Sequence, residues 1–408
     1  MFALIIFILF LAIIDVYAFF GLRASLFTVK PLVYSLIYAT TTLLTIIGVI
    51  VMVKAFSNLP ANQSFILNLT IGLTFSLIVA KLLFTTLFMV EDVLRGFLWL
   101  FQSAMNFRMT EFISRSYIWG LFSFSIGLVM LLLLNYGVLF GKYHYKVHHK
   151  ILTFKNLPES FNGFKIAQLS DMHLGTFDNM KKVKKGLKLL QMQNPDVIVF
   201  TGDMVNNKAD EALIYIDAMK ELSAPYGKYT IMGNHDYGDY VRWKNTAEKE
   251  QNEMHLAQLE KQMGFEWLNN MNVPLTKNGD TLHLAGVENW GLPPFPQHGN
   301  LKKALTGLSA DDFVVLLSHD PTHWREEVLK IAPNVALTLS GHTHGMQFGF
   351  ELGKYRWSPV KYKYPDWADL HKSNNQYLYI NRGFGHIGYP GRVGIRPEIT
   401  IIELQKAE

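Results

Sequence analysis

The sequence predicts two units of different class, a bundle of membrane helices followed by an α/β domain. Residues 1–141 carry 7 Lys or Arg and 4 Asp or Glu, whereas the remaining 267 residues carry 31 and 29. Four windows in the first unit are long and apolar enough to cross a bilayer. The second unit alternates short apolar strands with helices, which is typical of α/β architecture. We expect a membrane anchor over 1–141, a basic juxtamembrane linker over 142–155 and a globular domain over 156–408.

The composition excludes several classes of protein. Half of the 408 residues are hydrophobic and 17% are charged, so the chain is neither disordered nor a low-complexity repeat. It contains no cysteine, which excludes disulfide scaffolds, thiolate metal sites and cysteine nucleophiles. A formal net charge of +5 is too weak to indicate nucleic acid, and no nucleic-acid partner is expected.

The four apolar windows predict four membrane spans. They cover about Met1–Phe20, Pro31–Val53, Phe65–Val90 and Tyr117–Phe140. No basic residue precedes the first window, so we expect it to be a span rather than a cleaved signal peptide. Four spans put the amino terminus and the large domain on the same face of the membrane. Five basic residues on each side leave the orientation open.

Some polar residues in the first unit allow two interpretations. Asp15 and Lys81 fall inside apolar windows, where a structural pair is favoured over an ion or proton path. The stretch 97–120 mixes aromatic residues with Arg108 and Arg115, which fits either an interfacial amphipathic helix or an aromatic belt. The three histidines of 142–150 could bind a metal ion, but the interpretation as part of a solvated linker is favoured.

Short apolar runs bounded by Gly, Pro and Asn predict the strands of the second unit. These runs are 164–170, 196–202, 228–233, 282–287, 313–318, 335–340, 377–381 and 398–404. Helices are expected near 179–193, 211–222 and 246–263.

Five of the predicted strands end in polar clusters. The clusters are Ser170-Asp171-Met172-His173, Thr201-Gly202-Asp203, Gly233-Asn234-His235-Asp236, Ser318-His319-Asp320 and Ser340-Gly341-His342-Thr343-His344. Sites in α/β sheets gather at the carboxyl ends of strands, so we expect these side chains to meet. Carboxylate, amide and imidazole donors without sulfur suit Mn²⁺, Fe or Zn²⁺. One such cluster alone is usually structural, whereas five in order indicate a shared metal site.

The ordered clusters resemble the motifs of the calcineurin-like metallophosphoesterases. The matching residues are Asp171-x-His173, Gly202-Asp203, Gly233-Asn234-His235-Asp236, His319 and Gly341-His342-Thr343-His344. The resemblance covers about 150–408 and implies an α/β (α+β) fold, a two-sheet β-sandwich flanked by helices. The tails GHTHGMQFG and NRGFGHIGYPGRVGIRPEITIIEL resemble a bacterial membrane-associated branch, which includes enzymes that hydrolyse UDP-diacylglucosamine. Met346 stands where many relatives carry a second Gly.

The resemblance implies two divalent metal ions, Mn²⁺ first and Fe, Zn²⁺ or Mg²⁺ as alternatives. Asp171, His173, Asp203 and His344 would hold one ion. Asp203, Asn234, His319 and His342 would hold the other, with Asp203 bridging both. A hydroxide shared by the ions would attack phosphorus.

His235 resembles the histidine that such enzymes keep off the metals, which protonates the leaving oxygen. Asp236 either fixes the tautomer of His235 or caps the following turn, and Asp320 has the same ambiguity beside His319. Candidates for substrate binding are Asn289, Arg382, His386 and Arg392. The stretch Leu292–Pro296 fits a lid, a foot in lipid or a plain packing loop.

The resulting hypothesis is a membrane-anchored hydrolase of phosphodiester or diphosphate bonds. Its expected partners are the lipid bilayer and a phosphate-containing substrate, lipid-linked or nucleotide-linked. The alternatives are a non-catalytic metal-binding scaffold and a phosphomonoesterase or protein phosphatase. The four spans predict a multi-pass membrane protein. The resemblance implies a bacterial inner membrane and favours the cytoplasmic face for the domain.

Overall fold

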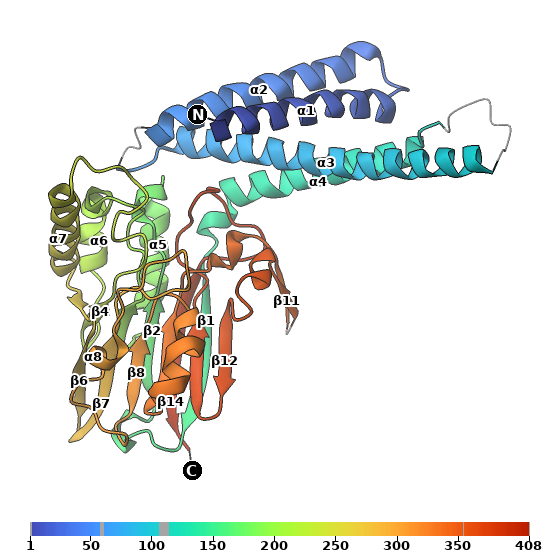
Figure 1. Ribbon diagram of the computed structural model, residues 1–408. Helices are drawn as coiled ribbons and strands as arrows, with labels where there is room; N and C mark the ends of the chain where they lie inside the picture. The colour runs from blue at the N-terminus through green and yellow to red at the C-terminus, as the bar shows by residue number, and fades with distance from the viewer. Residues whose placement is uncertain (1, 58–60, 106–113, 354, 408) are drawn as a thin grey trace. The chain divides into compact units, whose positions relative to one another are not determined.

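The computed structural model describes residues 2–57, 61–105, 114–353 and 355–407, which form two compact units. The first unit spans residues 1–59 and 66–139, and the second spans 60–65 and 140–408 (Figure 1). The described residues 61–64, between the second and third long helices, therefore belong to the second unit. There the Gln63 backbone N–H donates to the Gly175 carbonyl at 2.8 Å.

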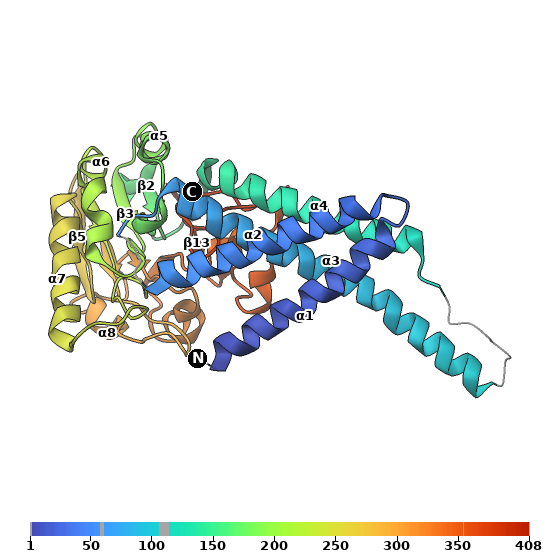
Figure 2. The same cartoon turned by 90° about the horizontal axis from the view of Figure 1, so that it is seen from above.

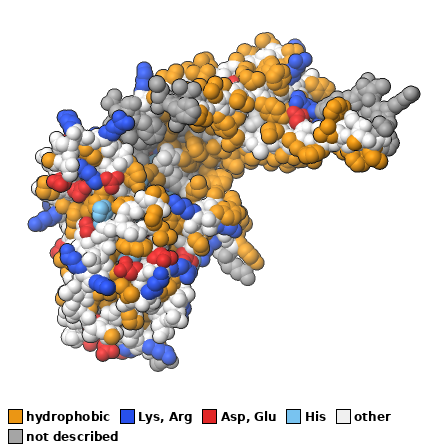
Figure 3. All heavy atoms as spheres, in the orientation of Figure 1, with side chains coloured by type: hydrophobic (Ala, Val, Ile, Leu, Met, Phe, Trp, Pro, Cys, Tyr) orange, Lys and Arg blue, Asp and Glu red, His pale blue; other side chains and the backbone are white. Residues whose placement is uncertain are grey.

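Four helices make up the first unit, and all four are long and apolar enough to span a membrane. They are α1 (Phe2–Ser25), α2 (Pro31–Ser57), α3 (Phe65–Ala104) and α4 (Tyr117–Leu139). Hydrophobic side chains cover most of their surface in Figure 3, as expected for helices in lipid. The chain is a multi-pass membrane protein.

Helix α3 is longer than the predicted third span. Its 40 residues extend about 60 Å, twice the hydrocarbon thickness of a bilayer. The aromatic stretch after Val90 is therefore helical up to Ala104, continuous with the span. Arg108 lies outside the described residues. Arg115 forms an ion pair with Asp92, which also pairs with Arg95 and accepts a hydrogen bond from the Tyr17 hydroxyl.

Asp15 and Lys81 form an ion pair inside the first unit, as the interpretation of a structural pair predicts. The Thr42 hydroxyl donates to the same carboxylate at 2.8 Å. A paired and hydrogen-bonded charge costs far less in lipid than an isolated one.

The second unit is built on two mixed six-stranded sheets and a separate hairpin. The first sheet has the order β1-β14-β2-β3-β4-β5, and the second β12-β13-β9-β8-β7-β6. The strands are β1 (Lys146–Phe154), β2 (Phe164–Leu169), β3 (Val197–Phe200), β4 (Lys228–Thr230), β5 (Glu266–Trp267), β6 (Met271–Lys277), β7 (Asp280–Gly286), β8 (Val314–Leu317), β9 (Val335–Ser340), β12 (Asp369–Ser373), β13 (Gln376–Ile380) and β14 (Glu398–Lys406), with the hairpin of β10 (Phe350–Leu352) and β11 (Tyr355–Trp357).

The two sheets pack face to face over a core of buried aliphatic and aromatic side chains. Phe164, Val199, Val315 and Leu337 belong to this core, which the strands of both sheets supply. Helices α5 (Met180–Gln191), α6 (Ile216–Lys220) and α7 (Thr246–Gln262) cover the other face of the first sheet. Both ribbon views show these helices outside the strands (Figures 1 and 2). The short helices α8 (Leu301–Ala304) and α9 (Leu329–Ile331) lie against the second sheet. The predicted β-sandwich flanked by helices is confirmed.

Two local expectations differ from the structure. Most of the stretch expected to be a solvated linker, 142–155, is strand β1, which pairs in parallel with β14. Only the last part of β1 is buried, so its sequence lacks the apolar run that marks the other strands. The helix expected over 211–222 is a 3₁₀ segment, Ala209–Tyr215, followed by the single turn of α6.

Candidate metal centre

The five polar clusters meet at the carboxyl ends of β2, β3, β4, β8 and β9. Each loop turns sharply after its strand, and several non-glycine residues there have left-handed backbone angles. These residues and their φ values are Asp171 (51°), His173 (47°), Asp203 (60°), His342 (71°) and His344 (50°). Non-glycine residues rarely adopt this conformation, and such strain gathers at functional sites. Gly202 has a φ of 90°, and a Cβ on it would lie 2.5 Å from the Gly233 nitrogen. Glycine therefore lets two of the loops approach each other.

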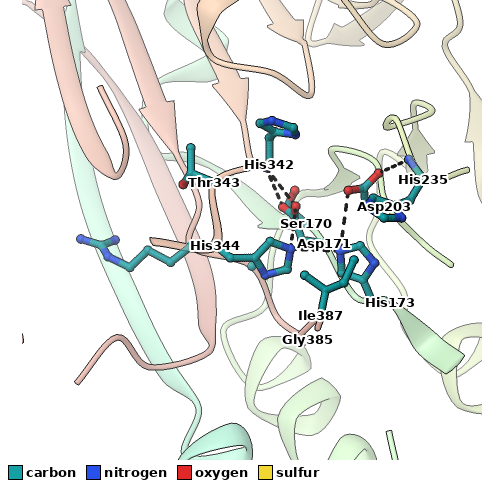
Figure 4. A network of polar contacts seen from close by, with 12 residues as sticks. Ser170, Asp171, His173, Asp203, His235, His342, Thr343, His344, Gly385 and Ile387 are labelled. Carbon is teal, nitrogen blue, oxygen red and sulfur yellow. Dashed lines mark hydrogen bonds and ion pairs between the residues drawn. The ribbon is translucent and has the colours of Figure 1, made fainter. Parts of the chain in front are cut away.

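Asp171, His173 and His344 form the first group of candidate ligands. All three are buried, and one donor atom from each lies within 4.8 Å of the others. The Nε2 atoms of His173 and His344 are 2.9 Å apart, and His344 Nε2 is 3.3 Å from Asp171 Oδ1. The Asp171 carboxylate also accepts a hydrogen bond from the His342 backbone N–H at 3.0 Å, which fixes its direction (Figure 4).

Asp203, His319 and His342 form the second group, again with donor atoms within 4.8 Å. His319 Nε2 lies 3.2 Å from Asp203 Oδ2 and 3.3 Å from His342 Nδ1. The Asn234 Oδ1 atom lies 2.9 Å from His342 Nδ1, so its amide oxygen joins this group. The structure thus brings together all seven residues predicted to bind metal.

The Asp203 carboxylate lies between the two groups. Its Oδ2 atom is 3.2 Å from His319 Nε2 in the second group and 3.6 Å from His173 Nε2 in the first. Its Oδ1 atom accepts a hydrogen bond from the His235 backbone N–H at 2.9 Å. Figure 4 shows Asp203 between His173 and His235.

The charges of the site favour a cation. Burial lowers the pKa of His173 and of His342, so both rings are neutral at pH 7 and keep a lone pair for a ligand. Burial also lowers the pKa of His319, but the Asp203 carboxylate outweighs it and raises that pKa to about 10. The facing Nε2 atoms of His173 and His344 are 2.9 Å apart, and two nitrogen lone pairs at that distance repel unless a proton or a cation lies between them. These residues therefore fit a metal with oxygen and imidazole ligands.

His235 lies at the edge of the metal groups, half-buried. Its ring centre is 4.9 Å from that of His173, and its Nδ1 atom is 2.8 Å from the Asn206 carbonyl oxygen. A carbonyl can only accept, so Nδ1 carries a proton and Nε2 is left to face the site.

Asp236 does not hold the His235 ring. Its carboxylate accepts hydrogen bonds from the backbone N–H groups of Asp203 at 2.8 Å and Gly233 at 2.9 Å. Burial, together with the charge of Asp203, raises the pKa of Asp236 to about 7. These contacts are structural, because Asp236 braces the loops of Asp203 and Gly233; both partners precede it in the chain, so neither contact caps the turn that follows.

Three groups beside the site were not predicted. The Tyr364 hydroxyl lies 2.9 Å from His342 Nε2, and the Tyr240 hydroxyl accepts from the Asn234 amide at 2.8 Å. The third is the Asn206 carbonyl that orients His235. Tyr240 lies within six residues of Asn234, so its closeness to this cluster could have been used to predict it. The segment around Tyr364 contains no motif that would have done so.

The four substrate-binding candidates lie in different surroundings. Asn289 is buried and donates to the Pro296 carbonyl at 2.8 Å. The Arg382 guanidinium forms a 2.6 Å ion pair with each of Glu398 and Glu351, which are the contacts of a structural residue. Neither has a described contact with the metal groups.

His386 and Arg392 lie nearer. His386 is buried against Phe177, with ring centres 5.5 Å apart, and neither of its ring nitrogens has a partner within the described chain. Arg392 Nη2 lies 3.2 Å from His344 Nδ1 and donates to the Arg382 carbonyl at 2.8 Å. Of the four, Arg392 contacts a candidate metal ligand. Substrate binding by these residues remains a prediction.

The segment Leu292–Pro296 lies beside the second group. The Phe295 ring meets the His342 ring edge-on, with centres 4.6 Å apart.

Asp320 Oδ2 is 3.5 Å from His342 Nε2, while Asp320 Oδ1 accepts from the Thr322 backbone N–H.

Two family models match the sequence of this chain. The family model of the calcineurin-like phosphoesterases matches residues 164–346. The model of a probable calcineurin-like phosphoesterase transmembrane domain matches residues 1–142.

Several relatives carry corresponding names. A Danio rerio transmembrane protein with metallophosphoesterase domain is 29% identical over 67% of this chain and 60% of its own length. The uncharacterized metallophosphoesterase YkuE of Bacillus subtilis is 32% identical over 61% of this chain and 82% of its own. The UDP-2,3-diacylglucosamine pyrophosphatase LpxG of Chlamydia trachomatis is 26% identical over 56% of this chain and 81% of its own.

The chain belongs to the calcineurin-like metallophosphoesterase family, whose members are metal-dependent. It combines that domain with a four-helix membrane region. It spans less than two thirds of the Danio rerio relative.

Proposed function

We propose that this protein is a membrane-anchored hydrolase of phosphodiester or diphosphate bonds that uses two divalent metal ions. The position of Asp203 carries the proposal, because one oxygen of its carboxylate lies within 3.6 Å of a donor atom in each group of ligands. A shared carboxylate is what holds two cations roughly 3.5–4 Å apart in two-metal hydrolases.

Asp171, His173 and His344 would hold one ion, and Asn234, His319 and His342 the other, with Asp203 between them. When bound, such ions polarise phosphoryl oxygens and make water a better nucleophile at neutral pH. The donor set suits Mn²⁺, with Fe, Zn²⁺ or Mg²⁺ as alternatives.

His235 would supply the proton for the leaving group. Asn206 fixes the Nδ1 proton, so the ring presents Nε2 to the site, and a protonated Nε2 donates to the departing oxygen. His235 belongs to neither group of ligands, which leaves the ring free for this step.

The membrane region supports a lipid-linked substrate, because an anchored enzyme searches a surface rather than a volume. The relative LpxG is named for a nucleotide-linked diphosphate that carries two acyl chains, which is a substrate of this class. We propose the phosphodiester or diphosphate of a lipid-linked or nucleotide-linked compound as the native substrate. A bacterial inner membrane, with the domain on its cytoplasmic face, fits such a substrate and remains part of the proposal.

The full-length protein in detergent with added Mn²⁺ should hydrolyse bis(p-nitrophenyl) phosphate. Replacing His235 with Ala should slow this hydrolysis about 10²- to 10⁴-fold and leave the bound metal unchanged, because the ring binds protons and not metal. Metal content by mass spectrometry separates this result from the effect of Asp203→Ala, which should lose both metal and activity.

Three outcomes would contradict parts of the proposal. An inactive protein with two bound metals would favour the scaffold. Faster hydrolysis of p-nitrophenyl phosphate than of the diester would favour a phosphomonoesterase. If His235→Ala lost metal as fast as activity, the assignment of the proton donor would be wrong.

A further inference from the structure

The β10–β11 hairpin places its polar residues inward and its apolar residues outward. The Arg382 guanidinium donates through Nε to the Glu351 carboxylate at 2.9 Å, and Arg356 forms a 2.5 Å ion pair with Asp369. Glu351 and Arg356 are directly opposite each other in the hairpin. One face of the hairpin is therefore fixed to the domain by charges.

Among the described strand residues of the hairpin, those on the opposite face are all apolar or aromatic. Phe350 pairs with Trp357 and Leu352 with Tyr355, so these four residues share the face. The exposed fractions are 46% for Phe350, 70% for Leu352 and 68% for Tyr355. The rings of Phe350 and Trp357 stack with centres 6.0 Å apart. In Figure 3, hydrophobic side chains lie on the surface where Figure 1 labels β11.

This pattern is the reverse of what a water-facing hairpin needs. An antiparallel pair with one solvated face normally turns its polar residues to water. A contiguous exposed apolar face on a folded domain indicates a partner or a membrane.

The base of the hairpin lies close to the place where the chain leaves the membrane helices. Gly141, two residues after the end of α4, packs so tightly that a Cβ on it would lie 2.0 Å from the Arg392 carbonyl oxygen. The next residue, Val393, bridges to Phe348, and the Gly349 N–H donates to the Val393 carbonyl at 3.0 Å. The path from Gly141 to the hairpin crosses from Val393 to Phe348, a strand spacing of about 5 Å, and then follows β10, whose three residues span about 10 Å. The hairpin therefore lies within about 20 Å of Gly141.

We propose that the apolar face of the β10–β11 hairpin rests in the lipid–water interface of the bilayer that the membrane helices span. The end of a span lies at that interface by necessity, so an apolar face within about 20 Å of it can reach lipid. The hairpin is thus a second attachment of the domain to the membrane, separate from hydrolysis.

The residues beside the hairpin fit this environment. Tyrosine and tryptophan are the side chains that proteins place at the level of lipid headgroups. Tyr362 is 77% exposed, and the Lys361 ammonium lies 5.3 Å from its ring centre. Exposed lysine close to aromatic residues matches anionic headgroups in charge. The partner of the apolar face is therefore an anionic phospholipid surface rather than a second copy of the chain.

The cysteine-free sequence allows a direct test. Leu352→Cys and Tyr355→Cys in the full-length protein each give one thiol for an environment-sensitive fluorophore. In nanodiscs of phosphatidylcholine and phosphatidylglycerol, both labels should emit at shorter wavelength than the same fluorophore on free cysteine in water. Brominated acyl chains should quench them severalfold.

Met254→Cys is the matched control, because Met254 is an apolar side chain with an exposed fraction of 60% on α7. Its label should stay unquenched. Equal quenching at 352 and 254, or none at 352 and 355, would overturn the proposal. The proposal would also be wrong if the label at 352 emitted at short wavelength in both kinds of nanodisc without being quenched by bromine. A protein surface would then cover the hairpin. Bound metal measured in parallel shows that the labelled variants are folded.

Discussion

His342 is held from both sides of its ring. Nδ1 faces the Asn234 amide oxygen at 2.9 Å, and Nε2 faces the Tyr364 hydroxyl at the same distance. The tyrosine can accept the Nε2 proton, which leaves the Nδ1 lone pair for a ligand. This contact was hidden from sequence analysis, because Tyr364 lies 22 residues after His342 in an irregular segment. The metal ligands themselves were accessible, since each directly follows a recognisable strand.

Replacing Tyr364 with Phe should weaken the binding of one metal ion about 10- to 100-fold and leave the other nearly unchanged. The hydroxyl orients His342 but makes no described contact with Asp171, His173 or His344. Titration of the metal-free protein with Mn²⁺, followed by mass spectrometry, measures the two affinities. Tyr362→Phe, at an exposed position, is the control and should bind both ions normally. Equal loss of both ions would show that the two groups do not bind independently.

Among the elements, β4 is the shortest strand that leads into the site, with three residues. Lys228 begins it, and its buried ammonium donates to the Met219 carbonyl at 2.9 Å and the Met263 carbonyl at 2.5 Å. It ties β4 to the ends of α6 and α7 and so helps to place the loop of Asn234 and His235. Burial lowers the pKa of Lys228 to about 8.

This pKa predicts a dependence of stability on pH. An unfolded lysine keeps its proton up to about pH 10.5, whereas folded Lys228 releases it near pH 8. Between these values the unfolded chain binds more protons, so stability rises with pH. The free energy of unfolding of the wild type should rise relative to Lys228→Met by at most about 3 kcal/mol from pH 8 to 10.5. Denaturant unfolding at several pH values measures this.

Lys220→Met, at an exposed position of α6, is the control, and its difference from the wild type should not change with pH. A constant difference for Lys228→Met would mean that the lysine stays protonated in the fold.

The elements that sequence analysis found are those with continuous apolar runs. The strand expected over 164–170 is β2, and the one over 335–340 is β9 with the same bounds. The sequence did not predict strand β1 or the β10–β11 hairpin, because charged and polar residues interrupt their apolar residues. Their pairing depends on β14 and on buried charges such as Arg382, which are distant in the sequence.

At the scale of the whole molecule, a buried ion pair fixes the point where the chain enters the second unit. Lys142 Nζ lies 2.6 Å from Asp178 Oδ2, both side chains are 2% exposed, and the Tyr143 hydroxyl donates to Asp178 Oδ1 at 2.7 Å. From charge density alone, the sequence predicts that the membrane region ends at residue 141 and that a linker over 142–155 precedes the domain. It could not show the pair, because a lysine three residues after an apolar helix usually faces water.

Lys142→Met should destabilise the domain by about 3 kcal/mol, because it leaves a buried carboxylate without its partner. For a domain of this size the midpoint of thermal unfolding should fall by roughly 6–12 °C. Tryptophan fluorescence of the full-length protein in detergent measures it. Lys142→Met combined with Asp178→Asn should recover much of the loss. If the double variant is no more stable than the single one, the pair itself is not what stabilises this entry point.

The pairing of β1 with β14 has a consequence for biosynthesis. β1 leaves the ribosome just after the fourth helix, yet its described neighbour in the sheet is made roughly 250 residues later. At 5–20 residues per second, the nascent chain carries an unpaired strand beside the translocation machinery for roughly 13–50 seconds. Chaperone access during that interval, rather than insertion of the helices, should limit the yield of active protein.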